Sequence, residues 1–261
     1  MSTNPLWYQT FEPRPAAQVR LYCLPCAGGG ASSYRPWTPF VPEWAELRAI
    51  RLPGRQARHR EASFDDCDTA ARALAGWLSE EDGPYALFGH SMGAMLAYRA
   101  TRFLLADGAR PPLFLASACW PVQGVPPTTM PATTDDDETF CAKVAGMGGA
   151  ASELLDDPDV RELVLPVLRA DFALCHSYRY RDEPPLPMPV AVYGGADDPV
   201  TVAESLDAWK AHAARLTGPR LFPGGHFFLQ ERADEFAGTV FSDLAAALRT
   251  VPLPADQGAR P

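Results

Sequence analysis

The 261-residue sequence has no long hydrophobic run and no surplus of basic residues. No segment approaches the roughly 18 apolar residues in a row that a membrane-spanning helix needs, so we expect no membrane association. The N-terminal stretch MSTNPLWYQTFEPRP lacks the basic and apolar regions of a secretion signal, so we expect a cytoplasmic protein. Lys and Arg number 23 against 32 Asp and Glu, giving a net charge of −9. This balance argues against a general nucleic-acid-binding protein.

The glycine-rich stretch CLPCAGGGASSY, from Cys23 to Tyr34, lacks key residues of the cofactor-binding motifs. It has no lysine, which a phosphate-binding P-loop needs, and Ser33 stands where a dinucleotide-binding fingerprint has its third glycine. A thioredoxin-like CxxC lies at a helix N-terminus, whereas Cys23 lies in an apolar strand-like run. No His, Cys and Asp group has zinc spacing, so we expect no metal and no resident cofactor. In a reducing cytosol, the six cysteines are expected to be thiols.

Short, almost continuously apolar runs alternate with segments of helical periodicity. Such runs are typical of strands covered on both faces of a sheet. We predict strands over 19–25, 47–53, 85–90, 112–119, 189–195 and 220–224, and helices over 63–80, 91–108 and 232–250. This alternation predicts an α/β fold with a mostly parallel, doubly wound sheet.

One long segment, about residues 131–182, interrupts the alternation. It contains helical patterns over 135–146 and 159–180 but no good strand, and proline-rich stretches flank it. We interpret it as a helical lid inserted between two strands of a single domain, residues 1–261. The alternative is that these helices belong to the main core.

The motif with the most chemical content is Gly89-His90-Ser91-Met92-Gly93, a G-x-S-x-G. The pattern alone arises often by chance, but here an apolar strand leads in and a helix leads out. That context is typical of a nucleophile elbow, where a strained turn exposes a serine hydroxyl near a helix N-terminus. Side chains at the flanking glycine positions would collide with neighbouring elements. We therefore predict an α/β-hydrolase fold with Ser91 as nucleophile, against the alternative of an ordinary tight turn.

A serine nucleophile needs a base, and the base needs an orienting acid. In this fold the three follow in the order Ser, Asp, His, each of the last two just after a strand. Asp197 and Asp198 follow the strand predicted over 189–195, and His226 follows the strand predicted over 220–224. We favour Asp198 because it directly precedes a proline, as the acid commonly does in such hydrolases. Asp197 remains the alternative.

An acyl intermediate also needs an oxyanion hole made of two backbone donors. The N–H of Met92, directly after the nucleophile, is one candidate, and a loop after an early strand should supply the other. We predict Ala27 as the second donor, because the adjoining glycines let the backbone approach a substrate without a Cβ in the way.

The remaining histidines have weaker claims to a catalytic role. His212 is predicted on a surface helix, His59 in a charged loop and His176 on a helix of the lid. His90 adjoins the nucleophile, but its side chain is expected to point away from the reaction centre.

Five stretches together resemble the type II thioesterases. They are LPCAGGGASSYRPW, AIRLPGRQAR, YALFGHSMGAMLAY, LRADF and YGGADDPV…LFPGGHFFL, and the resemblance covers roughly residues 15–245. Type II thioesterases are discrete α/β-hydrolases that accompany polyketide synthases and nonribosomal peptide synthetases. The resemblance implies hydrolysis of acyl groups held as thioesters on the phosphopantetheine arm of carrier proteins, with small acyl thioesters as further substrates.

The resemblance also implies a role for each matching residue. Carried over, it assigns the nucleophile, acid, base and two oxyanion donors to Ser91, Asp198, His226, Ala27 and Met92. An acyl-enzyme would form on the serine and be released by water. Two positions depart from the family pattern, which often has histidine or an aromatic residue in place of Cys26 and glutamate in place of His176. Both departures bear on the substrate pocket or lid packing, not on the triad.

Three other functions would use the same scaffold. A carboxylesterase or an acyltransferase would share the triad, because oxygen esters and thioesters react by one mechanism. A non-catalytic binding protein is disfavoured by the intact serine, aspartate, histidine and glycine-rich loop.

An arginine-rich stretch stands out in this acidic chain. Arg51, Arg55, Arg58 and Arg60 lie within ten residues. Carrier proteins are typically acidic, so the stretch is a candidate docking site. The alternative is a solvated loop with one arginine in a structural ion pair.

Overall fold

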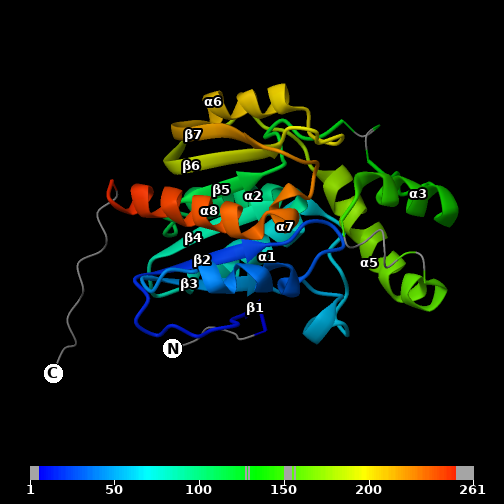
Figure 1. Cartoon of the computed structure of the whole chain (residues 1–261), viewed down its shortest axis with the longest axis horizontal. Coiled ribbons are helices and arrows are strands. Elements are labelled where there is room, and N and C mark those ends of the chain that lie inside the picture. The colour runs from blue at the N-terminus through cyan, green and yellow to red at the C-terminus, as the bar shows by residue number, and fades with distance from the viewer. Residues whose placement is uncertain (1–5, 127, 129, 150–154, 156, 251–261) are drawn as a thin grey trace.

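One seven-stranded sheet, ordered β1-β3-β2-β4-β5-β6-β7, forms the centre of the molecule (Figure 1). It is seen in a computed structural model, which describes residues 6–126, 128, 130–149, 155 and 157–250. β1 pairs antiparallel with β3, and the other strand pairs are parallel. The strands span Tyr8–Gln9 (β1), Val19–Leu24 (β2), Ala45–Ile50 (β3), Tyr85–His90 (β4), Leu115–Ala118 (β5), Leu186–Gly195 (β6) and Ala213–Phe222 (β7). The predicted α/β fold with a mostly parallel sheet is confirmed.

Helices connect the strands. The α-helices span Cys67–Ser79 (α1), Met92–Ala106 (α2), Asp137–Met147 (α3), Pro158–Ser177 (α5), Trp209–His212 (α6), Phe228–Glu231 (α7) and Ala233–Leu248 (α8). Among the described residues, 3-10 helices span Ala31–Phe40 (η1), Gln56–Arg58 (η2) and Ala203–Ala208 (η4). Among the described helices, none is long and apolar enough to cross a membrane.

Hydrophobic side chains fill the space on both faces of the sheet. In β2, Leu21 and Cys23 pack on the face covered by η1 and α8, whereas Tyr22 and Leu24 pack on the face covered by α1 and α2 (Figure 1). All four side chains are completely buried. A strand buried on both faces has no solvent-facing position, which explains why the sequence shows continuous apolar runs rather than alternation.

All six predicted strands are present, but the edges of the sheet differ from the prediction. β7 begins at Ala213, well before the predicted segment 220–224, and β1 was not predicted. β7 is an edge strand that pairs with β6 alone, and most of its side chains are at least partly exposed. It therefore has no apolar run to mark its start.

The helices α3 and α5 lie together beyond one end of the sheet and connect β5 to β6 (Figure 1). The described residues between these two strands form no strand, as predicted for 131–182. Phe140 and Val144 of α3 pack against Leu168 and Phe172 of α5 in a small core of their own. We call α3 and α5 the lid helices; that they act as a separate lid stays a prediction.

Candidate active site

Ser91 occupies a sharp turn between β4 and α2. Its backbone has φ 53° and ψ −114°, a conformation that residues with a side chain rarely adopt. Its N–H donates a hydrogen bond to the carbonyl of Ala118 on the neighbouring strand, at 2.8 Å. Such local strain gathers at functional sites, and the strand–turn–helix arrangement predicted for an elbow is present.

Two glycines beside Ser91 let α2 pack closely on the sheet. A Cβ at Gly89 would lie 2.3 Å from the backbone nitrogen of Ala94, and a Cβ at Gly93 would lie 2.2 Å from the carbonyl oxygen of Leu24. Both distances are far inside van der Waals contact, so a side chain at either position would push α2 away from the strands. The steric reason given for the G-x-S-x-G pattern holds at both glycines.

Asp198 and His226 are joined by a hydrogen bond after β6 and β7. The Nδ1–H of His226 donates to Oδ2 of Asp198 at 2.8 Å, and Oδ1 accepts the N–H groups of Val200 (2.8 Å) and Thr201 (3.0 Å). Burial alone would raise the pKa of Asp198, but the bonds from His226 and the two N–H groups hold it below its ordinary value. Asp197, by contrast, is exposed. The geometry thus joins His226 to Asp198 rather than to Asp197.

The second ring nitrogen of His226, Nε2, is buried and has no hydrogen-bond partner among the described residues. Because Nδ1 carries the proton donated to Asp198, Nε2 of the neutral ring presents a lone pair. His226 and Ser91 both line one cavity of about 210 Å³. The lone pair of His226 Nε2 and the hydroxyl of Ser91 therefore belong to the same cavity.

Apolar side chains dominate the lining of this cavity. Four are methionines, whose flexible thioethers adapt to irregular apolar ligands: Met92, Met95, Met130 and Met147. Cys26 and His176, the two positions that depart from the family pattern, also line the cavity. Burial raises the pKa of Cys26 to about 12, so its thiol is protonated at neutral pH and is a poor nucleophile.

The two predicted oxyanion donors lie beside the same cavity. Met92 is the first residue of α2, so its N–H has no partner within the helix. In the part of the chain that the structure describes, the Ala27 N–H donates no hydrogen bond, whereas the N–H groups of Gly28 and Gly29 both do. Both backbone N–H groups thus belong to residues that line the same cavity as Ser91.

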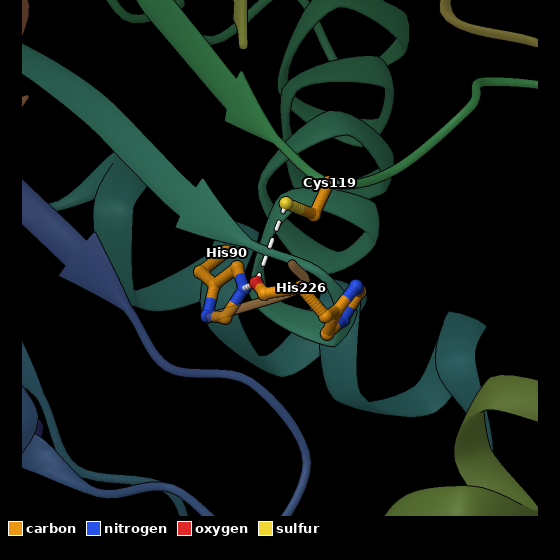
Figure 2. Close-up of side chains that lie close together, drawn as sticks. All are labelled: His90, Cys119 and His226. Carbon is orange, nitrogen blue, oxygen red and sulfur yellow. Dashed lines mark hydrogen bonds between the residues drawn. The ribbon is translucent and has the colours of Figure 1, made fainter. Parts of the chain in front are cut away.

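His90, Cys119 and His226 form a buried group whose possible metal-ligating atoms lie within 4.8 Å of one another. Figure 2 shows His90 and Cys119 directed at the backbone carbonyl of His226, while the His226 ring extends away from them. The His90 Nε2 to oxygen distance is 2.8 Å and the Cys119 Sγ to oxygen distance is 3.5 Å. Burial lowers the pKa of His90 to about 3, which keeps its ring neutral. We interpret His90 and Cys119 as residues that hold the backbone of His226, because both bond to its carbonyl, while Asp198 holds its Nδ1.

The arginine stretch is partly built into the fold. Arg55 and Arg58 are 9% and 8% exposed, and each forms an ion pair, Arg55 with Asp171 and Arg58 with a neighbouring glutamate. For these two arginines, the burial and the ion pairs favour the structural alternative over docking. Arg60 remains exposed. Asp171 was not predicted as a candidate functional residue, although it lies in the LRADF stretch that carries part of the family resemblance.

The histidines outside the cavity differ from one another. His212 lies on α6, which exposes Lys210 and Ala211 as predicted for a surface helix. Its own side chain is buried, however: it is 3% exposed, with 3.2 Å between the Tyr180 hydroxyl and His212 Nε2. Burial lowers the pKa of His212. His59 is exposed, as expected for a loop residue.

A mostly parallel sheet, with the strained serine after β4 and the paired aspartate and histidine after β6 and β7, defines an α/β-hydrolase. The family model of the thioesterase domain matches residues 19–244. This chain therefore belongs to the thioesterase family and is a thioester hydrolase.

Similar proteins are known by sequence and by structure. The chain is 32% identical over 231 residues to the gramicidin S biosynthesis protein GrsT of Aneurinibacillus migulanus, covering 86% of this chain and 88% of that protein. It is 35% identical over 250 residues to the probable cadicidin biosynthesis thioesterase of Streptomyces griseus, covering 92% and 67%. The solved structure of BorB, the type II thioesterase from the borrelidin biosynthetic cluster, matches with a TM-score of 0.79 at 31% identity, covering 94% and 100%.

Proposed function

We propose that this chain is a type II thioesterase of a polyketide or nonribosomal peptide pathway, and that it hydrolyses acyl groups from the phosphopantetheine arm of carrier proteins in the cytoplasm. One observation carries the proposal: Ser91, His226 and Ala27 line a single apolar cavity, with Asp198 bonded behind His226. The pathways named for the chain's relatives support the substrate class.

In the proposed mechanism, Ser91 Oγ attacks the thioester carbonyl while His226 Nε2 accepts its proton. Negative charge develops on the carbonyl oxygen, and the N–H groups of Ala27 and Met92 stabilise it. His226 then gives the proton to the leaving thiol, and the acyl group stays on Ser91. Water then attacks the acyl-enzyme as His226 takes its proton, and His226 returns that proton to Ser91 Oγ when the acid leaves. Asp198 keeps Nδ1 protonated throughout.

The chain's own residues would supply all of this chemistry, and the substrate would bring the phosphopantetheine arm. The apolar, methionine-rich lining suits acyl chains of varied shape. Small acyl thioesters lacking the carrier protein are then expected to react as well, because the cavity would hold the acyl group and the reacting carbonyl.

The proposal is tested by incubating a panel of acyl-loaded carrier proteins with the enzyme and following their masses. We expect the wild type to release acyl groups and Ser91→Ala to lose about 10⁴-fold or more of the rate. Hydrolysis retained by Ser91→Ala would refute the nucleophile assignment and would favour a binding protein contaminated by another hydrolase.

Two related enzymes are separated by substrate choice. A carboxylesterase would prefer the oxygen ester of an acyl-pantetheine over the thioester, whereas we expect the thioester to react faster. An acyltransferase would consume the thioester quickly only when an alcohol or amine acceptor is added.

A further inference from the structure

We infer that Asp171 of α5 and the buried Arg55 are positioning residues that hold the oxyanion loop, residues 25–30, in its reactive geometry. The inference rests on the proposed function, because it takes the Ala27 N–H as an oxyanion donor. It goes further by making the direction of that donor depend on a docked lid helix.

Asp171 binds the oxyanion loop at Gly28, the residue directly after Ala27. Its Oδ2 accepts the N–H of Gly28 at 2.7 Å and the Nη1 of Arg55 at 2.7 Å, and its Oδ1 accepts the Nη2 of Arg55 at 2.5 Å. The same Nη1 also donates to the carbonyl of Gly29 at 3.1 Å. One carboxylate and one guanidinium therefore hold two consecutive residues of the oxyanion loop.

These contacts act on the Ala27 N–H through a planar peptide group. The Cys26 carbonyl and the Ala27 N–H belong to one planar unit, so fixing the carbonyl fixes the N–H. The Cys26 carbonyl accepts the N–H of Gly29 at 3.0 Å and closes a turn in which Gly28 has φ +70°. Because Asp171 and Arg55 hold the two glycines of this turn, they set the direction of the donor.

The pair also makes the loop geometry depend on α5. Asp171 is 1% exposed and Arg55 9%, and the two are 116 residues apart in sequence. Moving α5 away from the loop would leave a buried guanidinium without its partner and the Gly28 N–H without its acceptor, and both are costly. The oxyanion hole is thus complete only when this part of the lid is docked.

The test compares Asp171→Ala and Asp171→Asn with the wild type on an acyl-N-acetylcysteamine thioester. Asp171→Ala removes both the charge and the acceptor, whereas Asp171→Asn keeps the volume and one acceptor oxygen. We expect kcat to fall about 10- to 100-fold in Asp171→Ala and less in Asp171→Asn, with KM changed less than about twofold. The reason is that a misdirected oxyanion donor loses only part of the transition-state stabilisation that is lost when the donor is removed.

A second readout separates positioning from a merely structural role. An alkyl boronic acid forms a tetrahedral adduct with a reactive serine and places an oxygen in the oxyanion hole. Its Ki should rise in parallel with the loss of kcat, while the Kd of an unreactive amide analogue of the substrate stays unchanged.

Asp243 offers a matched control. It is also a buried aspartate on a helix, α8, and accepts hydrogen bonds from the Tyr193 hydroxyl (2.7 Å) and from Arg220 Nη1 (3.0 Å). It is not among the described residues that line the cavity. Asp243→Ala should lower Tm as Asp171→Ala does, but leave kcat and the boronate Ki unchanged.

The inference is wrong if folded Asp171 variants keep the wild-type kcat and boronate Ki, because the pair would then be structural only. Equal weakening of the boronate and the amide analogue would also overturn it, since that result indicates a collapsed pocket. If Asp171→Ala does not fold, Asp171→Asn and Arg55→Lys decide the question by the same readouts. Failure of the proposed function looks different: the boronate would not inhibit the wild type, and Ser91→Ala would retain hydrolysis.

Discussion

His226 is fixed through its backbone as well as through its ring. Its carbonyl accepts hydrogen bonds from His90 and Cys119, and its Nδ1 bonds to Asp198. With its carbonyl and its Nδ1 both held, the His226 ring has little freedom to rotate, and Nε2 stays the atom without a partner among the described residues. At the scale of single residues, the site is therefore arranged around one basic nitrogen.

Replacing Asp198 by asparagine tests this arrangement. The new side chain would present an amide to His226, and the ring would no longer be held with its proton on Nδ1, so its Nε2 would often carry the proton instead. We expect kcat of Asp198→Asn to fall by about 10³- to 10⁴-fold with little change in KM. Steady-state kinetics on an acyl-N-acetylcysteamine thioester measures this, and unchanged kcat would exclude Asp198 as the orienting acid.

The same substitution is expected to change how the free energy of unfolding depends on pH in acid. The pKa of Asp198 is lower in the folded protein than its ordinary value of about 3.9, so below that value the unfolded state binds more protons. Its contribution to stability is present above this value and is lost as the pH falls through the folded pKa. Urea titrations from about pH 6 to about pH 3 should show a steeper loss of unfolding free energy in the wild type than in Asp198→Asn.

The positions of candidate residues were predictable where the chain places them at fixed distances from recognisable elements. The glycines around Ser91 and the proline after Asp198 mark their neighbours locally, and the structure joins Asp198 to His226. Asp171 and the burial of His212 were not predictable in this way. Their surroundings come from segments far away in sequence, Arg55 for the first and Tyr180 for the second.

At the scale of elements, the close packing of α2 on β2 places the serine next to the oxyanion loop. A Cβ at Gly93 would lie 2.2 Å from the Leu24 carbonyl oxygen and 2.7 Å from that of Pro25, which begins the loop. We expect Gly93→Ala to lower the free energy of unfolding by about 1–3 kcal/mol or more. We also expect it to reduce kcat, because the backbone of Pro25 must move.

Gly76 provides the matched control for that substitution. It lies within α1, and apart from its chain neighbours and the adjoining backbone of α1, no atom of the described residues lies within 4 Å of where its Cβ would be. Gly76→Ala should raise the free energy of unfolding by up to about 1 kcal/mol and leave kcat unchanged, because alanine is the better helix former. Thermal and urea unfolding of both variants measure the contrast; a tolerated Gly93→Ala would contradict the steric account.

Elements were predictable in proportion to their burial. The central strands β2, β4 and β5 are apolar on both faces, and their sequences show it. The 3-10 helix η1 was missed because it contains Pro36 and Pro39, although its buried residues Ala31, Tyr34 and Trp37 recur every three residues. It is held instead by packing, with Trp37 against Phe88 and Phe236 at ring distances of 4.9 and 5.6 Å.

At the scale of the whole molecule, the lid helices and the loop segment 51–66 lie toward the same end, whereas the C-terminal end of α8 lies at the other (Figure 1). The Arg58 guanidinium is already engaged within the chain, because it donates hydrogen bonds to Glu61 and lies over the Trp7 ring at 4.5 Å. Arg60 is exposed, and an acidic carrier protein arriving at this end would meet its charge.

Arg60→Glu separates docking from chemistry. We expect it to raise KM for an acyl-carrier protein by up to about tenfold and to leave KM for an acyl-N-acetylcysteamine thioester unchanged, because only the carrier meets that surface. The difference should shrink as salt is added, since exposed charges are screened. Arg249→Glu, at the far end of α8, makes the same change of charge away from the lid and should affect neither substrate. An equal effect of Arg60→Glu on both substrates would show that the arginine supports the fold of the loop, and carrier docking would then have to use another surface.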